Sequence, residues 1–233
     1  MKDNTLNLVL SAKNNRNTII LATELDSGQQ IIINNNQVDN ANKEILLAAQ
    51  SIINQGKSDV VNIDSKRWFI NISLPPLRLV TVGAVHIAQP LAEIATISGY
   101  EVTIIDPRAA FANNKRFPNI NILNEWPEEA LINFNIDNRT AVVTLTHDPK
   151  LDDSALHAAL KSDAFYIGSL GSKITHNARI ARLKIASFSD NEIKKIHGPV
   201  GLPIGARSPQ EIAISIMSQI IFTRNNFENS GTV

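Results

Sequence analysis

The sequence predicts an α/β protein with a small N-terminal α/β appendage, followed by a Rossmann-like, doubly wound and mostly parallel sheet. After the dipeptide Pro75-Pro76, short apolar runs alternate with segments of helical periodicity. The apolar runs lack strict apolar–polar alternation, which indicates strands buried on both faces of a sheet. Alternating strands and helices of this kind are typical of a parallel sheet covered by helices.

The N-terminal segment is rich in asparagine and only weakly patterned. Strands are expected at 29–35 and 67–74, with one helix between them that stops at Gly56. Apolar side chains recur there at helical spacing, at Ile45, Ala48, Ala49, Ile52 and Ile53. This pattern predicts a small unit with its own sheet and helix.

A domain boundary is expected at Pro75-Pro76, because neither residue offers the backbone N–H that a strand ladder needs. We therefore expect an appendage over residues 1–75 and a Rossmann-like domain over residues 76–233.

The elements of the second domain follow from the alternating pattern. Strands are expected at 77–82, 100–106, 119–123, 140–146 and 164–170, and helices near 86–98, 127–133, 152–160, 173–186, 190–196 and 209–224. The last helix has the strongest start signal, since Ser208-Pro209-Gln210-Glu211 is a capping box with proline at the first helical position.

The composition excludes several function classes. With 43% apolar residues the chain can bury a sizeable core. Lysine plus arginine and aspartate plus glutamate are 22 each, so there is no basic field to hold a nucleic acid. Without cysteine there is no disulfide, thiolate ligand or cysteine nucleophile. Neither a signal peptide nor a run of ~18 apolar residues is present, so we expect no membrane association and a cytoplasmic protein.

The first candidate segment for chemistry is the turn that opens at Gly83. Gly83-Ala84-Val85-His86-Ile87-Ala88 fits the dinucleotide fingerprint G-x-G-x-x-G/A at its first and third glycine positions. Val85 replaces the second glycine, where a side chain obstructs a pyrophosphate. Asp106 ends the next strand, close to the spacing of about 20 residues at which an acid meets a ribose hydroxyl. The turn either binds a nucleotide-like ligand or only connects strand and helix.

The second candidate segment is Thr146-His147-Asp148-Pro149, after the fourth strand of this domain. His147 and Asp148 could act as acid and base, or Asp148 could simply cap the turn beside a half-buried histidine. A metal site from His147, Asp152 and Asp153 is disfavoured, because their spacing matches no defined ligand pattern. No metal ligands and no catalytic residues are assigned.

The third candidate segment is the turn from Gly168 to Lys173. Its backbone N–H groups, the Ser172 hydroxyl and the Lys173 charge could cradle a phosphate, while Gly168 and Gly171 could equally allow close packing. The order of residues is not that of a P-loop, so ATP hydrolysis is not predicted. Arg179, further along the helix, is expected on a packed or solvated face.

The fourth candidate segment runs from Gly198 to Arg207 and leads into the last helix. Arg207 beside a helix N-terminus could clamp a phosphate or carboxylate, with Gly205 shaping the loop. A rigid connector explains the composition equally well.

Together these segments carry a family resemblance. The resemblance is carried by five stretches: VGAVHIAQPLAEIA, DPRAAFANNKRFP, LTHDPKLDDSAL, FYIGSLGSKITHNARIARL and IHGPVGLPIGARSPQEIAISI. In this order they resemble the C-terminal Rossmann domain of the XdhC/CoxI family, the accessory proteins of xanthine dehydrogenase. The resemblance covers about residues 67 to 224. The family's first motif usually reads G-x-G-H-V-A, so His86 matches and Val85 departs.

The resemblance implies a non-catalytic factor that binds the molybdenum cofactor (molybdopterin or its dinucleotide form), protects its sulfurated form and helps insert it into apo-xanthine dehydrogenase or a related molybdenum hydroxylase. The residues expected to bind the cofactor are Gly83, Val85, His86, Asp106, Arg108, Arg116, His147, Asp148, Gly168, Gly171, Ser172, Lys173, Gly205 and Arg207.

Two other functions are compatible with the sequence, and one family motif is missing from it. An NAD(P)-dependent oxidoreductase is suggested by Gly83 and Asp106, and a docking module without a ligand is also compatible with the sequence. Full-length family members carry an N-terminal domain with a glycine-rich stretch ending S-G-G-C, and that motif is absent here. A companion XdhC/CoxI protein is therefore expected to supply that half, and the chain could also form a homodimer.

Overall fold

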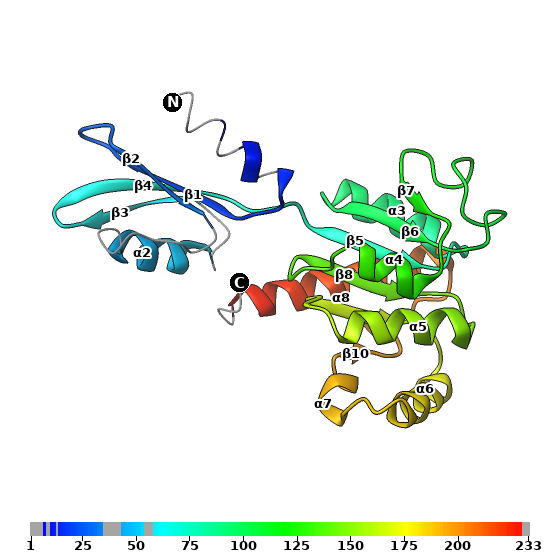
Figure 1. The fold of residues 1–233 in the computed structure, drawn as a ribbon. Coiled ribbons are helices and arrows are strands. Elements are labelled where there is room, and N and C mark those ends of the chain that lie inside the picture. The colour runs from blue at the N-terminus through cyan, green and yellow to red at the C-terminus, as the bar shows by residue number, and fades with distance from the viewer. Residues whose placement is uncertain (1–6, 8–9, 13, 35–42, 54–57, 230–233) are drawn as a thin grey trace. The chain divides into compact units, whose positions relative to one another are not determined.

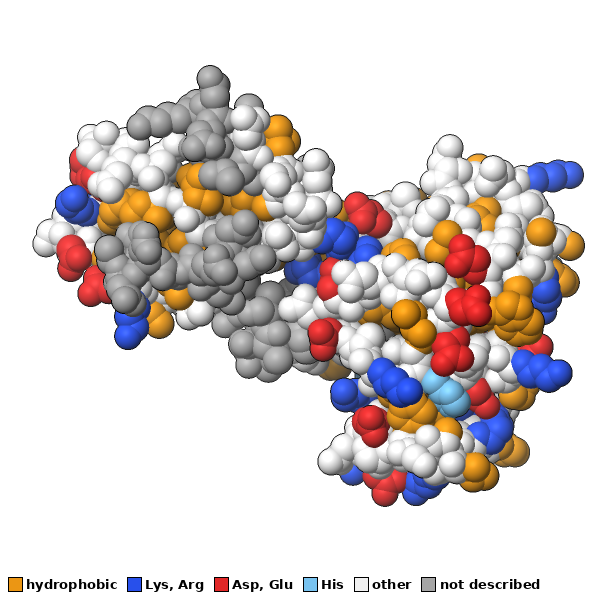
Figure 2. All heavy atoms as spheres, in the orientation of Figure 1, with side chains coloured by type: hydrophobic (Ala, Val, Ile, Leu, Met, Phe, Trp, Pro, Cys, Tyr) orange, Lys and Arg blue, Asp and Glu red, His pale blue; other side chains and the backbone are white. Residues whose placement is uncertain are grey.

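The computed structural model describes residues 7, 10–12, 14–34, 43–53 and 58–229. By its internal contacts the chain divides into an N-terminal unit, residues 1–76 with 227–233, and a C-terminal unit, residues 77–226 (Figure 1). On the face drawn in Figure 2, acidic and basic side chains are interspersed. Each unit has its own sheet.

In its described residues the N-terminal unit contains a four-stranded antiparallel sheet and the helix α2. Its elements are β1 (Ile19–Glu24), β2 (Gln30–Asn34), α2 (Lys43–Ile53), β3 (Asp59–Ile63) and β4 (Lys66–Ser73), in the sheet order β2-β1-β4-β3. Buried side chains of α2, among them Ile45 and Ala49, pack with Ile20, Trp68 and Ile70 of the sheet. The predicted helix and both predicted strands are present, while β1 and β3 were not anticipated. The predicted stop at Gly56 lies outside the described residues.

The C-terminal unit is a six-stranded, fully parallel sheet. Its strands are β5 (Arg78–Val82), β6 (Glu101–Ile105), β7 (Asn121–Leu123), β8 (Thr140–Thr144), β9 (Tyr166–Ser169) and β10 (Ile196–His197). Its helices are α3 (Ala88–Ile97), α4 (Pro127–Asn133), α5 (Pro149–Leu160), α6 (Lys173–Ile185), α7 (Asp190–Ile193) and α8 (Pro209–Asn229). The sheet order is β10-β9-β8-β5-β6-β7, so the predicted Rossmann-like α/β fold is confirmed.

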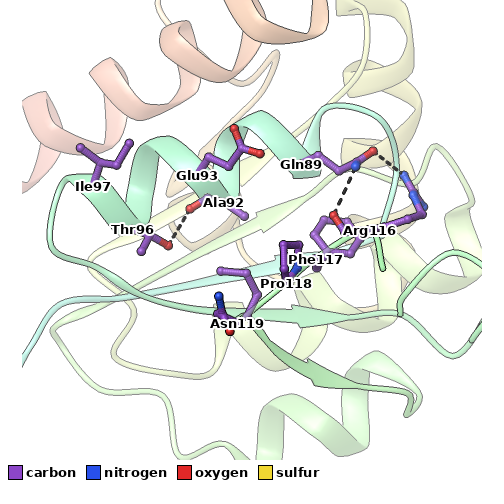
Figure 3. A pocket seen from close by; sticks show the side chains of 10 residues that line it. Gln89, Ala92, Glu93, Thr96, Ile97, Arg116, Phe117, Pro118 and Asn119 are labelled. Atoms are coloured by element: carbon purple, nitrogen blue, oxygen red, sulfur yellow. Dashed lines mark hydrogen bonds between the residues drawn. The ribbon is translucent and has the colours of Figure 1, made fainter. Parts of the chain in front are cut away.

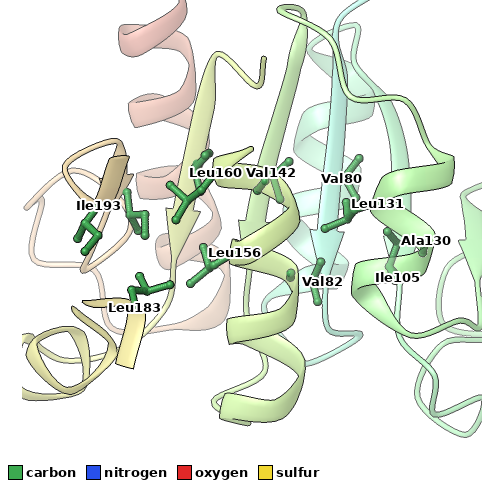
Figure 4. Packing of buried hydrophobic residues seen from close by; sticks show 14 residues of the cluster. Val80, Val82, Ile105, Ala130, Leu131, Val142, Leu156, Leu160, Leu183 and Ile193 are labelled. Atoms are coloured by element: carbon green, nitrogen blue, oxygen red, sulfur yellow. The ribbon is translucent and has the colours of Figure 1, made fainter. Parts of the chain in front are cut away.

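Helices cover both faces of the parallel sheet. On one face, α4, α5, α6 and α7 bury residues such as Leu131, Leu156 and Leu183 against Val80 and Val142 (Figure 4). Figure 4 also shows α8 behind the sheet, on the face opposite α5. Each of β5 and β8 is buried along its whole length, which explains why neither strand alternates strictly between apolar and polar residues.

Two details of the predicted elements can be compared directly with the structure. The helix expected over 190–196 ends at Ile193, and Ile196 instead pairs with Ile167 as the start of the short strand β10. The capping box before α8 is confirmed, since the Ser208 N–H donates to Glu211 Oε2 at 2.9 Å and the Glu211 N–H donates to Ser208 Oγ at 3.2 Å.

Candidate functional site

The candidate site lies along the carboxyl edge of the parallel sheet. The strand order places β5 beside β8, and the chain proceeds outward from this pair in both directions. Such a switch point is where open α/β sheets bind ligands. The turns after β5, β6, β8 and β9 all begin at this edge. They carry most of the residues that the sequence singled out.

The turn after β5 depends on glycine at its first position only. Gly83 has φ +106°, and a Cβ atom there would overlap the Thr146 side chain and lie 3.2 Å from the Thr146 backbone nitrogen. Val85 is half-buried and is not among the residues with positive φ. The valine therefore fits the backbone of the turn, and its departure from the fingerprint changes access to the turn rather than its shape.

This turn presents unused backbone donors. Ala88 begins α3 and donates to Val85 O at 3.1 Å, and the N-cap residue Ile87 provides no side-chain cap. Among the described residues, no acceptor takes the backbone N–H groups of Val85, His86 or Ile87. The N–H groups and the positive end of the helix dipole suit an anion such as a phosphate.

Asp106 supports the same turn from inside the protein. The carboxylate is fully buried and accepts hydrogen bonds from the Ala84 N–H at 2.8 Å and from the Arg108 N–H, Nε and Nη2 at 3.0, 2.8 and 2.8 Å. Burial would raise the pKa of Asp106, but these hydrogen bonds prevail and lower it. Each oxygen already accepts two hydrogen bonds, so Asp106 holds the turn in place of the expected ribose contact.

Arg116 ties the β6–β7 loop to the turn. Its Nη1 donates to Ala84 O at 2.6 Å and to Phe111 O at 2.7 Å, and its Nη2 donates to Gln89 Oε1 at 3.0 Å. Gln89 Nε2 returns a bond to Arg116 O at 3.2 Å (Figure 3). Arg116 is one of the predicted cofactor-binding residues, and these bonds to the protein show that it also shapes the turn.

The Gln89–Arg116 pair also borders a cavity of about 410 Å³ between α3 and the end of the β6–β7 loop (Figure 3). Its other lining residues are Ala92, Glu93, Thr96, Ile97, Phe117, Pro118, Asn119 and Ile120. No sequence motif predicts this cavity, because it depends on how the irregular loop folds against the helix.

The turn after β8 is organised by two aspartates with different roles. Asp148 caps α5 by accepting from the Lys150 N–H at 2.9 Å, which agrees with the capping interpretation. Asp152, almost fully buried, accepts from Thr146 Oγ1 at 2.7 Å, and burial raises its pKa. His147 is exposed with φ +63°, and among the described residues no hydrogen bond joins its side chain to Asp148. The acid–base interpretation of His147 and Asp148 therefore lacks geometric support.

The turn after β9 caps its own helix. Ser172 Oγ accepts from the Thr175 N–H at 3.1 Å, and Lys173 is exposed at the first position of α6. Arg179, only 2% exposed, lies beneath this turn and donates from Nη2 to Leu170 O at 2.8 Å. Arg179 thus supports the turn from below, a role that spacing along the helix could not distinguish from simple packing.

Charges connect three of these turns. Hydrogen bonds to Asp106 raise the pKa of Arg108, and the negative charges of Asp148 and Asp152 raise it further. Burial lowers the pKa of Arg179, and the charge of Asp152 opposes that change. Asp152 therefore lies within the electrostatic range of arginines from the β6–β7 loop and from α6, a relation that only the fold reveals.

The loop after β10 joins the site only in part. The Val200 N–H donates to Ser169 O at 3.2 Å, and a Cβ at Gly168 would overlap Val200 at 2.6 Å. A Cβ at Gly205 would meet no atom within 4 Å, and the Arg207 N–H donates to Glu211. Among the described residues, no contact brings Gly205 or Arg207 to the other predicted site residues.

The comparisons with known proteins decide the family. A family model described as the XdhC Rossmann domain matches residues 79–220, more than half of the chain. The chain belongs to the XdhC family. The resemblance seen in the motifs is therefore confirmed, and the matched region reaches from β5 into α8, with all the turns between them.

Two curated relatives of the XdhC chain are similar over about two thirds of its length. A probable xanthine dehydrogenase subunit of Bacillus subtilis is 32% identical over 157 residues, covering 67% of this chain and 46% of the relative. The molybdenum cofactor insertion chaperone PaoD of Escherichia coli is 31% identical over 150 residues, covering 64% and 41%. The chain thus matches less than half the length of each.

A solved structure extends the similarity. A crystal structure described as a xanthine dehydrogenase from Bacillus halodurans aligns with a TM-score of 0.70 at 25% identity, covering 96% of this chain and 64% of the other. This alignment reaches beyond the Rossmann domain into the N-terminal unit. In the described part of the XdhC chain, no helix has the length and hydropathy of a membrane span.

Proposed function

We propose that this chain is an accessory factor of a molybdenum hydroxylase. In this proposal it binds the molybdenum cofactor as cargo in the cytoplasm, protects its sulfurated form and delivers it to apo-xanthine dehydrogenase or a related enzyme, without turning over a substrate. Membership of the XdhC family supports the proposal, as do relatives named as a molybdenum cofactor insertion chaperone and a xanthine dehydrogenase subunit.

The observation that carries the proposal is the turn after β5. It offers three backbone N–H groups without acceptors among the described residues, at the start of α3, and Asp106 and Arg116 hold it from both sides. The molybdenum cofactor carries a phosphate, or a diphosphate in its dinucleotide form, and this is the part of the cargo that such a turn suits. Lys173 and the first turn of α6 would provide a second anion contact.

The metal end of the cargo needs other ligands. The chain has no cysteine, so it offers no thiolate to molybdenum. We therefore propose that a companion XdhC/CoxI protein supplies the remaining contacts, and that the chain acts with it or as a homodimer. The greater length of the curated relatives is compatible with a division of the work between domains.

NAD(P)-dependent oxidation is the alternative, and the geometry favours it less. Asp106 is the residue expected to meet a ribose, yet its carboxylate is fully buried and engaged by Ala84 and Arg108. Binding of NAD(H) by the wild-type protein at micromolar concentration would reverse this preference. A Val85→Gly variant that gains NAD binding from none would instead show that the valine removed an ancestral role.

The test measures which small molecule the chain carries. The full chain is purified from cells that make the cofactor, and the bound small molecules are identified by mass spectrometry. We expect molybdopterin or its dinucleotide, and we expect deletion of the gene to lower xanthine dehydrogenase activity. If no cofactor binds, with or without the companion protein, and deletion leaves the hydroxylase fully active, the proposal is wrong.

A matched pair of variants links the binding to the site. Arg108→Ala removes a cation beside the turn after β5, whereas Arg67→Ala removes an arginine that pairs with Asp26 in the N-terminal unit. We expect cofactor retention to fall in the first variant only. Equal retention in both would move the site away from this turn.

A further inference from the structure

The Arg108 side chain has its donor edge engaged and its flat face available. Nε and Nη2 form a two-pronged contact with Asp106, at 2.8 Å each. This is the edge with which an arginine grips a phosphate. The side chain nevertheless remains 39% exposed. Its remaining capacity therefore lies in Nη1 and in the face of the guanidinium, which stacks on planar rings.

An exposed aromatic ring lies against this guanidinium. The Arg108 Cζ atom is 4.8 Å from the centroid of the Phe111 ring, within the range of a cation–π contact. Phe111 keeps 47% of its surface exposed, which is unusual for a phenylalanine packed in a loop. Two flat groups thus lie in contact at the surface of the β6–β7 loop.

The protein fixes this pair relative to the turn after β5. Asp106 bonds both the Ala84 N–H and Arg108, while Arg116 bonds both Ala84 O and Phe111 O. The two bridges end on the same residue of the turn, Ala84. A ligand whose phosphate meets the N–H groups of Val85 to Ile87 would have the flat pair beside it.

We propose that Arg108 and Phe111 form a stacking platform for the planar heteroaromatic ring of a ligand whose diphosphate binds the turn after β5. The inference rests on the proposed function and assigns one part of the cargo to one part of the site. The ring is a nucleobase or a pterin, since both present a flat, polar aromatic face. Stacking needs no hydrogen-bond pattern from the ring, so the exposed faces of Arg108 and Phe111 are sufficient for it.

The test compares three ligands that share a diphosphate. Cytidine 5′-diphosphate, 6-hydroxymethylpterin diphosphate and inorganic pyrophosphate are titrated into the full wild-type chain by calorimetry. We expect at least one ring-bearing ligand to bind about tenfold more tightly than pyrophosphate, a gain typical of one stacked ring. The ligand with the larger gain in affinity over pyrophosphate, cytidine diphosphate or the pterin diphosphate, identifies the ring that stacks on the platform.

Two variants test whether the gain in affinity comes from Arg108 and Phe111. Phe111→Ala removes the ring, and Arg108→Lys keeps the charge but loses the flat face. In both, we expect the ring-bearing ligands to lose about tenfold in affinity relative to pyrophosphate, and in Phe111→Ala the affinity for pyrophosphate itself should change by less than about twofold. Phe222→Ala, which removes another exposed phenylalanine, and Arg67→Lys are the matched controls and should leave all three affinities unchanged.

The outcomes separate this inference from the proposed function. If wild-type protein binds all three ligands equally and Phe111→Ala changes nothing, the platform is wrong, while pyrophosphate binding still supports the anion turn. If neither these ligands nor the molybdenum cofactor binds, both are wrong. The affinity ratio in the wild type is decisive even if a variant fails to fold, because it needs no substitution.

Discussion

The turns after β5 and β9 look alike in sequence, since each places glycine before a helix, but they treat their backbone donors differently. The helix after β9 receives a side-chain cap from Ser172, and Arg179 supports its turn from below. The helix after β5 has no side-chain cap, and its turn is held instead by Asp106 and Arg116. Support from outside the turn thus leaves N–H groups available to a ligand, whereas self-capping consumes one of them.

The largest effect is expected from Gly83→Ala. The new Cβ would overlap Thr146 and lie in a backbone region of positive φ, so we expect the free energy of unfolding to fall by about 3 kcal/mol. Gly171→Ala should cost about 1 kcal/mol, because the nearest neighbours of its Cβ are side chains, Thr175 at 3.0 Å and Arg179 Nη2 at 3.7 Å. Chemical denaturation measures both. Equal losses would contradict the stricter packing assigned to the turn after β5.

Gly99→Ala is the control for that comparison. Gly99 also has positive φ, at +84°, but no atom lies within 4 Å of its Cβ position. Its loss of about 1 kcal/mol would therefore report backbone strain alone. Subtracting it from the loss in Gly83→Ala isolates the clash with Thr146.

Asp106→Asn should come next, with a loss of about 2 kcal/mol at pH 7. The variant removes the buried charge that faces Arg108, and the exposure of Arg108 moderates the cost. Because the folded-state pKa of Asp106 is lowered, its stabilisation is present above the ordinary value of about 3.9 and is lost as the pH falls through the folded-state pKa. Unfolding curves from pH 7 to pH 3 should therefore show the gap between wild type and variant shrinking.

Asp26→Asn is the control for the charge of Asp106, because it removes an exposed carboxylate instead of a buried one. Asp26 pairs with Arg67 at 2.9 Å, but both side chains are more than half exposed. We expect a change below about 0.5 kcal/mol at any pH, as for other surface pairs. A pH-independent gap in Asp106→Asn would mean that its cost comes from packing rather than from the ion pair.

Apart from the control variants, the smallest effect, similar to that of Gly171→Ala, is expected from Ser172→Ala. Loss of the cap leaves the Thr175 N–H without its side-chain acceptor and should lower the free energy of unfolding by about 1 kcal/mol. Ser189→Ala, at the capping box of the short helix α7, tests whether the size of the loss belongs to α6. Unchanged stability in Ser172→Ala would show that water replaces the cap, and the contrast between the two turns would weaken.

The fold was predictable because its signal is local and repeated. The buried strands β5 and β8 and the capping box at Ser208 each carry their own pattern, and the alternating apolar runs agree on a parallel sheet. The strands β1 and β3 were missed because they lie in a weakly patterned segment, and β10 was missed because it has only two residues. Pairing, rather than local preference, creates them.

The candidate site was predictable in place but not in the roles of its residues. Parallel strands must bring their carboxyl ends to one edge, so the positions of Gly83, Asp106 and Asp148 followed from the fold. Which side chains turn inward did not follow. Asp106 and Arg116 form bonds to the backbone of the turn, and Asp152 and Arg179 become important because each reaches back from its helix to the turn before it.

The contact between Gly83 and Thr146 bears on how related sequences are compared. Even with a smaller residue at 146, a Cβ at 83 would lie 3.2 Å from the backbone nitrogen of residue 146, on a backbone with φ +106°, so the joining of the two strands favours glycine here whatever the ligand. A glycine at this position in a related sequence thus reflects how the two strands join rather than which ligand is bound. The residue at 85, which the backbone leaves unrestricted, is where divergence between relatives should record a change of cargo.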